Sequence, residues 1–225
     1  MTSDRETLPD VAKPVNYHVS LFDLQLGGSW GYKGLVKVDA KVARPTNEIV
    51  LNAKELEVQH AEVLGKDGGC AQLAKASDIS YDKKSERVTF KFPQEIAPQD
   101  VVLSINFTGV MNDAMAGFYR SKYKPVGEPA ADTPKEGEFF YMLSTQFESC
   151  DARRAFPCFD EPNLKAAFDF EIEVPKQQTA LSNMPIKSER DGSHSGLKVV
   201  TFEKTPVMST YVSIPNISVD GRALD

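Results

Sequence analysis

The alternation of apolar and polar residues at a period of two constrains the fold of this 225-residue chain most strongly. Segment 36–42 reads VKVDAKV, and segment 168–174 reads FDFEIEV. Successive side chains of a β-strand point to opposite faces, so each such segment can bury one face and expose the other. We therefore predict strands over 17–21, 36–42, 56–64, 88–92, 101–107 and 168–174.

The connections between these segments also favour a β protein. The sequence DGSHSG at 191–196 predicts a hairpin loop between strands at 186–188 and 197–202. No long segment has helical periodicity, and a short helical turn is expected only at 163–167, after Pro162. Prolines, glycines and charges at 124–138 predict an exposed loop. The predicted class is all-β, a large twisted antiparallel sheet or sandwich of about a dozen strands.

Composition narrows the environment and the partners. The 32 acidic and 26 basic residues give a formal charge of −6, which argues against a nucleic-acid partner because phosphate binding needs a basic face. The N-terminus lacks the apolar core of a signal peptide, and no apolar run has membrane-spanning length, so no membrane partner is expected. Three cysteines in a chain without a leader fit a reducing compartment, which predicts a cytoplasmic protein.

The sequence contains few metal-binding residues. Its three histidines are His18, His60 and His194, and none lies in an H-E-x-x-H pattern. Cys150 and Cys158 are too far apart for a C-x-x-C pair and have no histidine nearby in the sequence. A closed zinc site needs such a ligand set, so we predict no metal site and no catalytic residue within this chain.

The same two cysteines raise the alternative of a thiol nucleophile. Two arginines follow Cys150, and their charge would favour a thiolate. However, Cys158 is flanked by aromatic residues and proline in the segment 156–159, and free cysteines are usually small buried apolar residues. No partner base is indicated either, so we expect both thiols to be buried and rank a cysteine hydrolase last.

Gln146 and Glu148 are the candidate substrate-binding residues. On an extended segment, residues two apart point to the same side, so the amide and the carboxylate would project together. The carboxylate could bind a protonated α-amine while the amide oxygen accepts a second N–H. The alternative is a buried ion pair of Glu148 with Arg153 or Arg154. Spacing alone favours that alternative, because structural ion pairs outnumber ligand sites.

Four blocks in a fixed order carry a family resemblance. They are GFYRS at 117–121, the stretch 145–162, LSNMP at 181–185 and MSTY at 208–211. The chain from 14 to 211 resembles the N-terminal domain of the gluzincin-class zinc aminopeptidases of peptidase family M1, the relatives of aminopeptidase N and puromycin-sensitive aminopeptidase, of a fungal and cytosolic type. The resemblance implies a saddle-like all-β domain.

The resemblance also implies roles for individual residues. Gln146 corresponds to a substrate-contacting glutamine, and Glu148 to the glutamate that binds the free α-amino group of a peptide. Arg153, Arg154 and the turn 160–162 are implied to be architectural. The family's zinc ligands, general base and transition-state tyrosine belong to a following catalytic domain, against which this domain would pack. Zinc is thus expected in the full-length family and not in this chain, which we expect to be inactive alone.

The resemblance further divides the chain into a flexible tail at 1–13, the β domain at 14–211 and an aberrant tail at 212–225. That last tail stands where the family continues toward the catalytic domain. Val212-Ser213 can be encoded by GTAAGT, which resembles the start of an intron, so we hypothesise that 212–225 is translated intron. A trimmed chain is the other explanation. The alternative function is a non-enzymatic β-sheet module that binds peptides or other partners.

Overall fold

The computed structural model describes residues 7–66, 71–123, 139–212 and 215–218, and the loop predicted at 124–138 lies outside these ranges. Within the described ranges the chain forms strands and two short 3₁₀ turns, η1 (Ala152–Arg154) and η2 (Thr210–Val212). The all-β class is therefore confirmed. The described part of the chain contains no helix with the length and apolar character that crossing a membrane requires.

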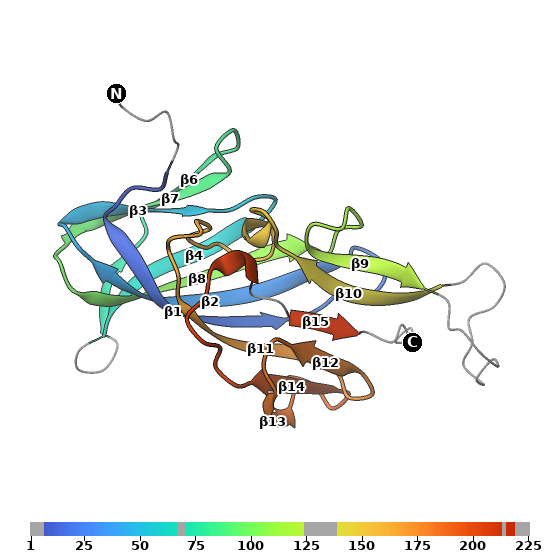
Figure 1. Cartoon of the computed structure of the whole chain (residues 1–225). Coiled ribbons are helices and arrows are strands. Elements are labelled where there is room, and N and C mark those ends of the chain that lie inside the picture. Colours follow the sequence, from blue (N-terminus) through green and yellow to red (C-terminus); the bar gives the residue numbers. More distant parts are fainter. Residues whose placement is uncertain (1–6, 67–70, 124–138, 213–214, 219–225) are drawn as a thin grey trace.

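The largest sheet has eight strands and runs through the middle of the molecule (Figure 1). All neighbouring strands in it are antiparallel except β1 and β11, which pair in parallel through Asn16↔Ala167 to Leu21↔Ile172. The strands are, in spatial order, β13 (Ile186–Asp191), β14 (Leu197–Phe202), β11 (Ala167–Pro175), β1 (Ala12–Phe22), β2 (Gly31–Val42), β8 (Asp100–Val110), β4 (Glu57–Gly65) and β5 (Gln72–Lys75).

Two smaller sheets accompany the eight-stranded sheet. One contains β3 (Thr46–Asn52), β7 (Arg87–Ile96) and β6 (Asp78–Asp82). The other contains β12 (Thr179–Ser182), β15 (Pro215–Ser218), β10 (Phe140–Gln146) and β9 (Gly117–Tyr123). In Figure 1 the red strand β15 lies beside β10 and β12, and its backbone pairs with both. A strand thus lies inside the range 212–225, while the division into tails and domain stays a prediction.

The predicted alternation accounts for which strand faces are buried. In β2 the side chains of Val36, Val38 and Val42 are buried, whereas those of Lys37 and Lys41 are exposed. The helical turn expected at 163–167 is instead a single hydrogen-bonded turn, in which the Leu164 N–H bonds the Glu161 carbonyl at 3.0 Å. The turn extends no further because β11 begins at Ala167, where the chain enters the large sheet.

Aromatic rings form the centre of the core. The rings of Tyr17 and Phe168 stack with centroids 4.8 Å apart, and Phe156 meets Tyr17 edge-on at 6.2 Å. Phe156 also contacts Phe170 at 6.2 Å and Phe147 at 6.0 Å, again edge to face. Edge-to-face and offset pairs of this kind stabilise the core beyond their buried area. The segment after β10 therefore packs into the core of the large sheet.

Two glycines allow aromatic rings to lie flat across the pairing of β2 and β8. Gly34 is directly opposite Phe107, and Gly109 is opposite Tyr32. A Cβ on Gly34 would lie 2.2 Å from the Phe107 ring, and a Cβ on Gly109 would lie 2.4 Å from the Tyr32 hydroxyl oxygen. Neither distance is sterically allowed, so each ring depends on the glycine beneath it.

Two buried tyrosine hydroxyls connect the large sheet to the segment that follows β10. The Phe159 N–H donates to the Tyr17 hydroxyl at 3.0 Å, and the Tyr32 hydroxyl donates to the Ala155 carbonyl at 2.9 Å. Burial raises the pKa of both tyrosines, so both hydroxyls keep their protons. Strands β1 and β2 thereby satisfy backbone groups of an irregular segment far away in the sequence.

We predict that Tyr17→Phe lowers the free energy of unfolding by about 1–3 kcal/mol, because the buried Phe159 N–H loses its acceptor. Urea denaturation measures this loss. Tyr141→Phe is the matched control, because its ring packs on Trp30 at 4.6 Å and its hydroxyl has no hydrogen bond within the described residues. Equal stabilities of the two variants would show that the Tyr17 hydrogen bond contributes nothing.

Candidate functional site

The segment 147–162 connects β10 to the turn before β11 and is hydrogen-bonded on two sides. On one side, Asn52 and Cys158 form an isolated bridge with N–O distances of 2.8 and 3.1 Å, and the Lys54 N–H donates to the Arg153 carbonyl at 2.9 Å. On the other side, the Ser209 hydroxyl donates to the Pro162 carbonyl at 2.8 Å. Residues at and just after the end of β3, together with Ser209 shortly before η2, thus fix this irregular segment in place.

A buried ion pair between Arg153 and Asp160 joins two parts of the segment 147–162. The Arg153 Nε donates to Asp160 Oδ2 at 2.9 Å, and the two side chains are 12% and 3% exposed. Burial raises the pKa of the Asp160 carboxyl, an effect that the Arg153 guanidinium opposes by donating a hydrogen bond. Arg153 also contacts Glu86 at 3.2 Å, and Glu86 pairs with Lys54. This network supports the architectural role implied for Arg153 and the turn 160–162.

Arg154 belongs to a second cluster on η1. Its Nε donates to Asp151 Oδ1 at 2.8 Å, and its guanidinium also pairs with Glu55. The backbone of Arg154 lies against Gly117 at the start of β9. Both arginines therefore have acidic partners, and neither partner is Glu148.

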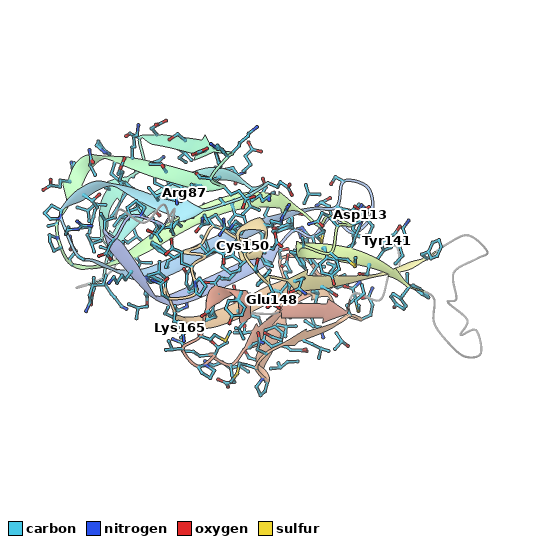
Figure 2. All side chains as sticks on the ribbon, turned by 45° about the horizontal axis from the view of Figure 1, so that its top comes forward. Arg87, Asp113, Tyr141, Glu148, Cys150 and Lys165 are labelled. Carbon is cyan, nitrogen blue, oxygen red and sulfur yellow. The ribbon has the colours of Figure 1, made fainter. Side chains whose placement is uncertain are left out.

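Gln146 and Glu148 lie where β10 ends. Both are exposed, and the residue between them, Phe147, is buried. Figure 2 labels Glu148 together with its neighbour Cys150 near the middle of the molecule. Among the residues that the structure describes, no ion pair to Glu148 is found, so the alternative of a buried pair with Arg153 or Arg154 is not observed. The substrate-binding role of Gln146 and Glu148 stays a prediction.

The Gln146 amide oxygen takes part in one hydrogen bond within the loop. The backbone N–H of Glu148 donates to Gln146 Oε1 at 3.2 Å. An amide oxygen has two lone pairs, so this contact leaves one acceptor position and both Nε2 hydrogens of the amide unused. The pair thus combines a carboxylate that suits an ammonium ion with an amide that can still donate and accept.

The side chains that the structure describes do not fit a zinc ion. The described residues contain no group of three or more His, Cys, Asp and Glu side chains arranged to hold a metal. His18 Nδ1 lies 3.2 Å from Asp169 on the outer face of the large sheet, and His60 Nε2 lies 3.6 Å from Glu62. The other ring nitrogen of His18, Nε2, lies 3.9 Å from Asp39. The two carboxylates thus lie at different ring nitrogens of His18, whereas a zinc site needs three or four ligands that converge on one point.

The two described cysteines differ in their environments. Cys158 is fully buried, as expected, and burial raises the pKa of its thiol well above the usual value. Cys150 is exposed, so the expectation of burial is wrong for this residue. Cys150 is exposed because it lies on the turn between the exposed Glu148 and η1. Cys158 is buried because it bridges to β3 beneath the aromatic core. The only side-chain contact found for Cys150 within the described ranges is the Ser149 hydroxyl at 3.7 Å.

Sequence reasoning missed several residues that position the site. Glu55 and Lys54 come from the connection after β3, and Gly117 comes from β9. The signal for Gly117 was present in the GFYRS block, which the resemblance singled out without assigning a role to its glycine. Nothing in the local sequence marks Glu55 as the partner of an arginine 99 residues later.

Comparisons with known proteins agree with this architecture. Residues 13–212 match the family model described as the peptidase M1 N-terminal domain. The chain is 38% identical over 207 residues to the puromycin-sensitive aminopeptidase of Caenorhabditis elegans, covering 92% of this chain and 20% of that protein. It is 40% identical over 206 residues to aminopeptidase M1-B of Oryza sativa (91% and 21%), and 38% identical over 213 residues to aminopeptidase 2 of Candida albicans (93% and 20%).

The chain is much shorter than the relatives that it matches. It spans about a fifth of the length of the curated aminopeptidases that it matches. The nematode, rice and yeast proteins are nearly equal in identity, so the fungal character stays a prediction.

The thiol environments lead to a labelling prediction. In the native chain, iodoacetamide should alkylate Cys150, and Cys158 should react only after unfolding, because its thiol is buried and its pKa is raised. Peptide mass mapping after timed labelling identifies the modified cysteine, and a Cys150→Ser variant serves as the control. Rapid native labelling of Cys158 would contradict its place beneath the aromatic core.

Proposed function

The chain belongs to the peptidase M1 N-terminal domain family, and on this basis we propose that it anchors the free amino end of a peptide substrate for a zinc aminopeptidase. The observation that carries the proposal is the exposed carboxylate of Glu148, which has no ion-pair partner among the described residues and lies on an anchored loop. Gln146 lies two residues away and presents its amide beside the same loop. We assign Glu148 to the α-ammonium group and Gln146 to an acceptor on the first residues of the peptide.

A carboxylate at this place would distinguish a chain end from an internal peptide bond. The α-ammonium group is charged and has three N–H donors, whereas an internal amide is neutral and has one. A charge-assisted hydrogen bond is about twice as strong as a neutral one. An exopeptidase requires this discrimination, and Glu148 can supply it without taking part in bond cleavage.

The cleavage chemistry is proposed to lie outside this chain. Zinc, when bound in an M1 aminopeptidase, supplies an activated water for hydrolysis, and the residues described here do not form a site for it. We propose that this β domain, residues 14–211, packs against the catalytic domain of the same enzyme in the cytoplasm. Exposed apolar side chains support such packing, namely Met142, Leu181, Val207 and Tyr211.

Glu148→Ala is expected to weaken binding of tetra-alanine amide by about 1–2 kcal/mol, roughly five- to thirtyfold in Kd, because the ammonium loses its counter-charge. Glu148→Gln, which keeps the shape of the side chain, should lose almost as much. NMR titration of the labelled chain measures both, and N-acetylated tetra-alanine amide should bind every variant equally weakly. Glu95→Ala, which removes another exposed carboxylate in β7, is the matched control.

Equal affinity of the wild type and Glu148→Ala for the free-amine peptide would remove Glu148 from the site. Binding of the acetylated and free peptides with the same affinity by the wild type would overturn chain-end recognition itself. It would favour the alternative of a general β-sheet interaction module.

The purified chain is expected not to hydrolyse leucine p-nitroanilide above the buffer rate, with or without added zinc, since no residue set described here activates a metal-bound water. Absorbance of released nitroaniline measures this rate. A parallel sample with a chelator shows whether any cleavage requires a metal ion, and a mock purification without the chain identifies contaminating metallopeptidase. Cleavage that copurifies with the chain and disappears with the chelator would contradict the proposed division of roles.

A further inference from the structure

Gly117 lies at the start of β9 directly opposite Gln146, the first residue of the candidate site. Its φ is +68°, in the left-handed region that glycine favours. A Cβ at this position would lie 2.4 Å from the Arg154 Cβ and 3.2 Å from the Asp151 carbonyl oxygen. Neither atom is the end of a flexible side chain, so a side chain at 117 requires a backbone shift.

Arg154 is itself held too firmly to move away. Its side chain pairs with Asp151 and Glu55. Its N–H donates to the Asp151 carbonyl at 3.0 Å, and its own carbonyl accepts a bond from the Tyr32 hydroxyl at 3.3 Å. The next carbonyl, of Ala155, accepts the stronger bond from the same hydroxyl at 2.9 Å. The turn η1 is therefore fixed to the large sheet from one side and to the connection after β3 from the other.

The turn that Gly117 contacts also closes the loop that presents Glu148. The Asp151 N–H donates to the Phe147 carbonyl at 3.0 Å, so the chain from Phe147 to Asp151 is bent back against η1. Gln146 is fixed at the other end of this loop by its pairing with Gly117. One close contact, between Gly117 and Arg154, thus joins the two ends of the loop 147–151.

We propose that the contact between Gly117 and Arg154 is a positioning device that sets where the Glu148 carboxylate stands relative to β9 and β10. The role for the carboxylate rests on the function proposed above. Gly117 and Arg154 act through the loop and touch no substrate. The ion pairs of Arg154 have a second effect, since they engage Asp151 and Glu55 and leave Glu148 as the nearby carboxylate available to an ammonium ion.

Gly117→Ala tests the proposal, and Gly28→Ala is its matched control. Gly28 also has a positive φ, +62°, but a Cβ there meets no atom within 4 Å. Both variants place an alanine at a similar positive φ, and only Gly117→Ala adds the steric contact. Amide NMR shifts across 147–154 and hydrogen exchange of the Asp151 and Arg154 amides report the loop directly, and titration with tetra-alanine amide reports binding.

We expect Gly117→Ala to shift the loop amides, to speed exchange of the Asp151 and Arg154 amides roughly tenfold or more, and to weaken peptide binding by a similar factor. Gly28→Ala should match the wild type in all three. Loop shifts and exchange rates that are the same in the two variants would overturn the proposal.

Two further outcomes are decided by the same experiments. If Gly117→Ala does not fold, Arg154→Gly takes its place, because it keeps Gly117 and removes the Arg154 Cβ that Gly117 contacts, together with both ion pairs. Faster exchange of the Asp151 amide then supports the positioning contact, and unchanged exchange overturns it. If the wild type binds no peptide, the proposed function fails, while the loop amides still decide whether Gly117 and Arg154 fix the loop.

Discussion

The site depends on the requirement that buried backbone groups be hydrogen-bonded, applied to a segment that is not a strand. Residues 147–162 pass through the core without a continuous ladder, and an unpaired N–H or C=O there would be costly. The partners come from elsewhere: the Tyr17 and Tyr32 hydroxyls, the Asn52 backbone and the Ser209 hydroxyl. Because these partners belong to β1, β2, β3 and the segment before η2, the loop that carries Glu148 forms only when the sheets are assembled.

The buried pair of Arg153 and Asp160 is best understood as a determinant of position. Taking two charges out of water costs several kcal/mol, so such a pair contributes little net stability, while loss of one partner costs about 3–5 kcal/mol. Two charged side chains that must pair in a buried environment allow few alternative conformations of the chain between them. That chain contains η1 and Cys158. The pair thus selects one path for the segment, and the aromatic contacts of Phe156 stabilise that path.

The sequence predicted local features well and long-range ones poorly, for a physical reason. Alternation in 36–42 and 168–174 reports which side of a strand meets solvent, and the structure agrees except at Glu173, which is buried and accepts hydrogen bonds from Ser193. Alternation carries no information about which strands are neighbours, so the parallel pairing of β1 with β11 could not be anticipated. The same limit applies to the site. Exposure of Gln146 and Glu148 around a buried Phe147 follows from the pattern, whereas one partner of Arg154, Glu55, comes from the distant connection after β3. The proposed role of Glu148 came from the family resemblance, since spacing alone favoured an ion pair.

An exposed carboxylate is a weak anchor by itself, and this explains why the rigidity of the loop matters. Two opposite charges 4 Å apart attract by about 1 kcal/mol in water and by about 4 kcal/mol where the effective dielectric constant is near 20. A second domain that covers Glu148 would therefore strengthen its hold on an ammonium ion without any new contact to it. The β domain can hold the Glu148 carboxylate in position before a peptide binds. A carboxylate that is already in place loses little conformational entropy on binding. The buried network behind the loop provides that geometry, and in the proposed enzyme the increase in electrostatic strength would come from a catalytic domain that covers Glu148.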